Sequence, residues 1–139
     1  THTPAAALEL DDGRIITGKT TNLLGASAAL LLNVIKELAG LKHELHIISP
    51  ESIEPIQKLK VDYLKSKNPR LHTDEVLIAL SASAATNPDA RLALQQLSKL
   101  NGCQAHISVM LSDVDIRTFK RLGVQLTCEA VYETGYNYH

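Results

Sequence analysis

The residues most suggestive of chemistry lie at positions 13–20, Gly-Arg-Ile-Ile-Thr-Gly-Lys-Thr. This run matches the phosphate-loop pattern G-x-x-x-x-G-K-T, in which backbone N–H groups surround a nucleotide's phosphates and the lysine contacts the outer ones. The interior Arg-Ile-Ile-Thr favours extended structure, however, and Asp11-Asp12-Gly13 favours a tight turn. We therefore predict a β-hairpin here and keep a nucleoside-triphosphate hydrolase as an alternative.

A weaker form of the same chemistry is an anion site between the end of this strand and the next helix. Unpaired N–H groups and the helix dipole favour an anion at such a position. The candidate ligand-binding residues are Thr17, Gly18, Lys19, Thr20, Thr21, Asn22, Gly25 and Ser27. The alternative is that Thr21 or Asn22 only caps the helix and Gly25 allows close packing.

A second candidate segment precedes a later helix. It combines cationic side chains, a histidine and two carboxylates, a set able to bind a phosphate or carboxylate or to transfer protons. Its residues are Lys67, Asn68, Arg70, His72, Asp74 and Glu75. The alternative is a solvated loop with an ordinary helix cap, so no catalytic residue is assigned.

The hydrophobic pattern predicts the elements that position these segments. Apolar residues alternate from position 7 to 10, and Leu24, Ala28, Leu31, Ile35 and Leu38 have helical spacing. We predict strands at 7–10, 14–17, 45–48, 105–111 and 124–131. We predict helices at 24–38, at 49–63 or 52–63, and at 73–86, 87–101 and 112–122. The order β-β-α-β-α-α-α-β-α-β predicts one α/β domain over residues 1–139, a three-layer sandwich with a mixed, largely parallel sheet covered on both faces.

Composition excludes several classes of function. A net charge of −1 and 4% aromatic residues argue against nucleic-acid binding. The longest apolar run is too short to span a membrane, no signal peptide is evident, and no zinc-binding or other cofactor-binding motif is present. We therefore expect a cytoplasmic protein without a metal or cofactor. The single methionine, Met110, suggests a piece of a longer protein.

Several of these stretches closely resemble the C-terminal domain of a bacterial family known only as domain of unknown function 1846, or uncharacterised protein family 0371. They are residues 13–20, 24–33, 66–75 and 84–90. The resemblance spans nearly the whole chain and implies a C-terminal fragment of a larger bacterial protein. It implies no known reaction.

The order of elements also resembles the cytidine-deaminase type of α/β/α sandwich. Deaminases hold zinc on two helix starts that carry His-or-Cys-x-Glu and Pro-Cys-x-x-Cys. This chain keeps Thr17-Gly18 and Asn22 but has Gly25-Ala26-Ser27 at the first start, and no cysteine in residues 50–55. The resemblance therefore implies a zinc-free, deaminase-like scaffold.

These observations leave two further expectations about partners. The first hypothesis is a domain that binds a small anionic, phosphate- or nucleotide-like metabolite, with a site completed by the remainder of the full-length chain. The alternative is a structural module that forms a homo-oligomer, since Tyr132, Tyr136 and Tyr138 crowd the last eight residues.

Overall fold

The computed structural model describes residues 5–108 and 111–128 and begins with the predicted hairpin. Strands β1 (Ala5–Glu9) and β2 (Ile15–Lys19) pair antiparallel, with Ala7 opposite Thr17. Gly13 has φ +90° in the turn between them, a conformation that costs glycine little. The hairpin prediction is therefore confirmed.

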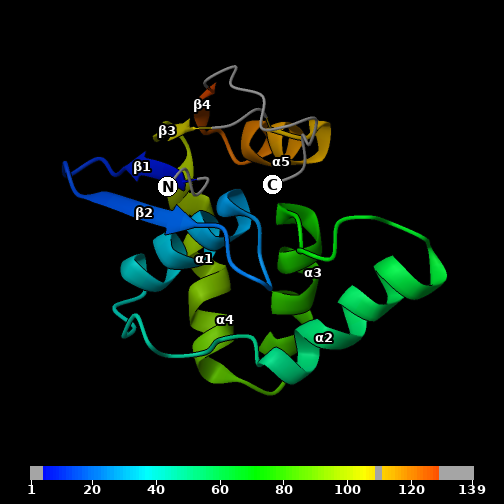
Figure 1. Ribbon diagram of the computed structural model, residues 1–139. Coiled ribbons are helices and arrows are strands. Elements are labelled where there is room, and N and C mark those ends of the chain that lie inside the picture. Colours follow the sequence, from blue (N-terminus) through cyan, green and yellow to red (C-terminus); the bar gives the residue numbers. More distant parts are fainter. Residues whose placement is uncertain (1–4, 109–110, 129–139) are drawn as a thin grey trace.

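Within residues 5–108 and 111–128, four strands form one open, mixed sheet in the order β2-β1-β3-β4 (Figure 1). Strand β3 (Gln104–Ile107) pairs antiparallel with β1, and β4 (Gln125–Cys128) pairs parallel with β3. The mixed sheet is confirmed, whereas the expectation that it is largely parallel is wrong, because two of its three pairings are antiparallel.

In the described part of the chain, five α-helices and two shorter helical segments connect these strands (Figure 1). The predicted division at Asn87-Pro88 is confirmed, since the Asn87 side chain accepts hydrogen bonds from two N–H groups of the next helix. The helical elements are α1 (Ala26–Leu38), α2 (Pro50–Lys58), the π-helical η1 (Leu59–Tyr63), α3 (Thr73–Ala84), α4 (Pro88–Gln95), the 3₁₀ segment η2 (Gln96–Leu100) and α5 (Asp113–Arg121). None of the helices in the described residues is long and apolar enough to cross a membrane.

The strand predicted at residues 45–48 is wrong. These residues form a turn and an irregular segment in which Ile47 and Ile48 are buried, while Leu45 and His46 are exposed. An apolar run satisfies a buried irregular segment as well as a strand, so the pattern alone does not distinguish the two.

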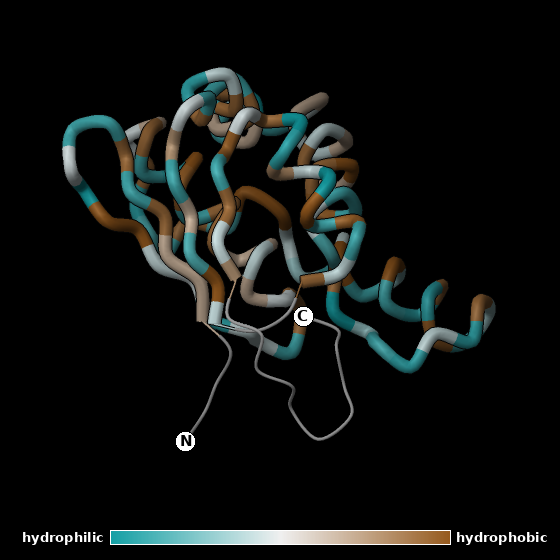
Figure 2. The backbone as a smooth tube through the Cα atoms, turned by 90° about the horizontal axis from the view of Figure 1, so that it is seen from above, coloured by the Kyte–Doolittle hydropathy of each residue, from teal (hydrophilic) through white to brown (hydrophobic). Residues whose placement is uncertain are grey.

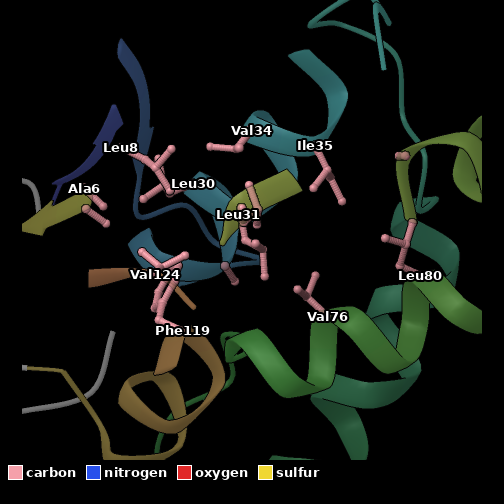
Figure 3. Close-up of a cluster of buried hydrophobic side chains, with 14 of the residues drawn as sticks. Ala6, Leu8, Leu30, Leu31, Val34, Ile35, Val76, Leu80, Phe119 and Val124 are labelled. Atoms are coloured by element: carbon pink, nitrogen blue, oxygen red, sulfur yellow. The ribbon is translucent and has the colours of Figure 1, made fainter. Parts of the chain in front are cut away.

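The core lies between one face of the sheet and the helices (Figure 3). Leu8 of β1 packs with Leu30 and Leu31 of α1, and Phe119 of α5 closes the same cluster. Figure 2 shows the strands gathered on one side of the molecule and most helical coils on the other.

The opposite face of the sheet carries Glu9, Ile15, Gln104 and His106, all of them exposed. Within the described residues the sheet therefore has helices on one face only. The second helical layer of the expected three-layer sandwich is not found there.

Candidate ligand site

A concavity of about 670 Å³ opens beside the end of β2. Its walls come from β2, the loop that follows, α1 and the irregular segment 43–48. Five residues predicted from the sequence line it: Thr17, Gly18, Lys19, Thr21 and Asn22. The volume is in the range of small-molecule sites.

The lining of this concavity combines basic and amide side chains with apolar ones. Lys19 and Lys36 contribute ammonium groups, and the apolar residues include Leu32, Ile48 and Ile53. No aspartate or glutamate belongs to the lining among the residues described. Electrostatics at this position therefore favour an anion.

Lys36 is the unusual member of the set because its side chain is buried, near the C-terminal end of a largely apolar helix. Its Nζ donates a hydrogen bond to the carbonyl oxygen of His43, which also lines the concavity. Burial lowers the pKa of Lys36, and nearby Glu44 partly opposes that effect. A bound anion would relieve part of this cost.

Gly18 allows β2 and α1 to pack closely, which is not the role that a phosphate loop would give this glycine. A Cβ built on Gly18 would lie 2.4 Å from the backbone nitrogen of Leu30, so only glycine lets β2 approach α1 this closely. Residues 15–19 form a paired strand rather than a loop around a phosphate. The loop geometry that a phosphate-loop hydrolase requires is therefore absent from this segment.

The other three residues predicted for the first segment do not line the concavity. Gly25 is the N-cap residue of α1, and its N–H donates to the carbonyl oxygen of Leu71 at 3.2 Å. The hydroxyls of Thr20 and Ser27 are buried and have no hydrogen-bond partner among the described residues. Neither of these two side chains faces the concavity.

The second predicted segment forms a compact ionic cluster with a residue from η1. Lys60 is buried, and its Nζ donates to Glu75 Oε1 at 2.8 Å and to the carbonyl oxygen of Arg70 at 2.6 Å. The backbone N–H of His72 donates to the same carboxylate oxygen at 2.8 Å, and His72 Nδ1 lies 3.3 Å from it. Glu75 thus ties the first turn of α3 to η1.

The pKa values in this cluster follow from those contacts. Burial raises the pKa of Glu75, but hydrogen bonds from His72 and Lys60 outweigh it and bring the value to about 2. The hydrogen bond to Glu75 raises the pKa of His72, against the effect of burial. The cluster therefore holds a carboxylate and favours a protonated imidazole.

Asp115 of α5 completes the N-terminus of α3. Its Oδ1 accepts hydrogen bonds from the Thr73 N–H at 2.9 Å and from the Thr73 hydroxyl at 2.7 Å. Its Oδ2 has no partner among the described residues, and burial raises the pKa of Asp115 although Thr73 opposes this. His72 is the N-cap residue of α3.

The two predicted segments meet through backbone contacts, although only the first faces the concavity. Arg70 Nε donates to the carbonyl oxygen of Thr21 at 2.6 Å, and the N–H of Leu71 donates to the carbonyl oxygen of Leu23 at 2.9 Å. The side chain of Asn68 is buried and accepts from the Arg70 N–H, while Lys67 and Asp74 are exposed. The second segment therefore holds Thr21 and Leu23, which line the concavity, without lining it itself.

Comparison with known proteins supplies the family. Residues 1–138 match the family model described as domain of unknown function DUF1846, C-terminal. The chain belongs to this family. It is 62% identical over 129 residues to a UPF0371 protein of Corynebacterium urealyticum and 47% identical over 133 residues to one of Streptococcus uberis. These alignments cover 93% and 96% of this chain but only 26% and 27% of the two relatives, so the chain spans about a quarter of their length.

Family membership confirms the first resemblance, to an uncharacterised bacterial family. It assigns no reaction, and the deaminase-like scaffold stays a prediction. In the described part of the chain, no group of three His, Cys, Asp or Glu side chains is arranged to hold a metal ion.

The sequence did not predict a site role for five residues: Lys36, His43, His46, Lys60 and Asp115. Lys36 left one signal, a lysine inside a helix whose neighbours at most positions are apolar. Asp115 looked like an ordinary first-turn residue, because its contact with Thr73 joins positions 42 residues apart.

Proposed function

We propose that this domain binds a small anionic metabolite, phosphate- or nucleotide-like, in the concavity beside β2. The single observation that carries the proposal is the lining itself. Lys19, Lys36, His43 and His46 are brought together there, and no carboxylate belongs to the lining among the described residues. A charge-assisted hydrogen bond to an anion is stronger than a neutral one.

The two sides of the concavity suit different parts of such a ligand. The ammonium group of Lys36 has three N–H donors, and the hydrogen bonds described for it use one, on the His43 carbonyl oxygen. Lys19 and Asn22 are exposed at the rim and can add donors to the same anion. The apolar side, formed by residues such as Leu32 and Ile53, suits a ring or another uncharged body.

The scaffold and the setting of the site are part of the proposal. A zinc-free, deaminase-like scaffold supports a nucleotide-like ligand, but the anion site depends only on the lining residues. The relatives are about four times as long as the matched region, which supports a site completed by the upstream polypeptide. We also propose that the protein is cytoplasmic.

Ligand binding is tested by isothermal titration with pyrophosphate and adenosine monophosphate as probes. We expect Lys36→Met and Lys19→Ala each to weaken binding about tenfold, the loss of roughly one charge-assisted hydrogen bond. Lys67→Ala is the matched control, because Lys67 is exposed but does not line the concavity. Equal affinity in all four proteins, or no binding of either probe, would overturn the proposal.

A further inference from the structure

The helical segment formed by α2 and η1, with the residue that follows it, carries a group of exposed apolar side chains. Leu59, Val61, Tyr63 and Leu64 are 48%, 39%, 68% and 67% exposed. We call these four side chains the apolar arm. They make up almost half of the large exposed hydrophobic side chains in the described residues, within six consecutive positions.

The exposure of the apolar arm does not result from a loose segment. Ile53 is buried, Gln57 Nε2 donates to the carbonyl oxygen of Asn22 at 2.9 Å, and Lys60 is held by Glu75. The spacing of positions 53, 57 and 60 places these anchors on one helical face. The segment is therefore attached to the body along that face.

The C-terminal end of this helical segment is also fixed by backbone hydrogen bonds. The N–H of Leu64 donates to the carbonyl oxygen of Leu59 at 3.0 Å, and that of Ser66 donates to the carbonyl oxygen of Lys60 at 2.8 Å. In Figure 1, α2 extends away from α3 toward the edge of the molecule. A fixed, projecting segment thus presents apolar side chains to solvent.

Such a group indicates an interface. Isolated exposed hydrophobic residues are common on soluble proteins, but neighbouring ones mark an interaction site. Leu59 and Tyr63 are four positions apart and Val61 and Leu64 are three apart, so each pair is adjacent on the helical surface. Tyrosine is also enriched among the residues that contribute most to binding energy, because its ring is apolar and its hydroxyl is polar. None of the four side chains of the apolar arm lines the concavity, which α2 reaches through Ile53.

The comparisons point to one occupant of this surface. About three quarters of each relative's polypeptide lies outside the matched region, and the matched family model is a C-terminal one. A domain in the same polypeptide is present at a high effective concentration, and domains of one chain commonly share an interface. We propose that the apolar arm docks against the polypeptide that precedes this domain in full-length family members.

Side-chain footprinting with hydroxyl radicals tests this docking. The two samples are the 139-residue chain and the full-length Corynebacterium urealyticum relative with its matched region replaced by this chain. We expect Tyr63 and Leu64 to be oxidised at least fivefold more slowly in the full-length protein. Leu92 of α4, which is 39% exposed, is the matched control and should react equally in both.

A second measurement separates docking from self-association and from misfolding. Leu64→Asp should lower the melting temperature of the full-length chimera and leave that of the 139-residue chain unchanged. Unaltered oxidation of Tyr63 and Leu64 in the chimera would overturn the proposal. Concentration-dependent protection of the same residues in the 139-residue chain would also overturn it, since the occupant would then be a second copy.

Discussion

Replacing Glu75 by glutamine tests the ionic cluster behind the concavity. The side chain keeps its size, and its amide oxygen still accepts from the His72 N–H, but the negative charge beside Lys60 is lost. The change in the carboxyl pKa from 4.5 to about 2 corresponds to about 3 kcal/mol at most. Because the Glu75 side chain is 27% exposed, solvent screening reduces this to about 2 kcal/mol.

The sign of the pH dependence follows from the lowered pKa. Glu75 stabilises the folded state fully above its unfolded pKa near 4.5, and this contribution is lost as the pH falls toward about 2. We therefore expect Glu75→Gln to be about 2 kcal/mol less stable than the wild type at pH 7. The difference should fall to about 0.4 kcal/mol near pH 2, because the wild-type carboxyl is then protonated in the unfolded state and about half protonated in the folded state.

Urea unfolding followed by circular dichroism between pH 7 and pH 2 measures this difference. Asp115 titrates in both proteins, so its raised pKa cancels in the comparison. The matched control is Glu54→Gln, at an exposed position of α2, which should change the unfolding free energy by less than about 0.5 kcal/mol. The reasoning is refuted if Glu75→Gln costs no more than this control, or if its cost persists unchanged at pH 2.

Two further substitutions probe the wall of the concavity. Gly18→Ala should destabilise the domain by at least about 3 kcal/mol in urea unfolding, because the added Cβ meets the Leu30 backbone, whereas Gly13→Ala should cost only about 1–2 kcal/mol, from its positive φ in open space. Equal costs would show that β2 can move away from α1. Arg70→Ala should weaken anion binding by moving the loop, so the slope of log Kd against log salt should stay constant, whereas Lys36→Met should lower it. A reduced slope in Arg70→Ala would instead mean that Arg70 contacts the anion.

Local chemistry explains which parts of the fold could be predicted. The turn at Gly13, the buried first helix and the cap at Asn87 depend on neighbouring residues, and each is confirmed. The segment 45–48 was misjudged because burial of Ile47 and Ile48 depends on distant elements. The sequence also could not predict that, within the described residues, the helices cover only one face of the sheet. The order of elements does not state which face each helix covers.

The same distinction separates the predicted from the missed residues of the candidate site. Residues 17–22 were predicted because a strand end followed by polar residues and a helix start is a local pattern. Lys36 and Lys60 each required knowledge of what packs against a helix face. Three of the predicted residues, Thr20, Gly25 and Ser27, do not line the concavity. They were predicted with the others because the sequence pattern does not show which side of a loop faces a cavity.

The two predicted segments therefore differ in role, although their compositions are similar. Both combine lysine with hydrogen-bonding side chains near a helix start, but the second contains Glu75, whose carboxylate pairs with Lys60. A cation already paired with a carboxylate has less to gain from an external anion, because the ligand must replace an existing contact. Lys36 is held only by a carbonyl oxygen among the hydrogen bonds described, so its charge stays available. This difference in compensation, rather than the number of basic residues, supports the proposal that the anion binds in the concavity beside β2.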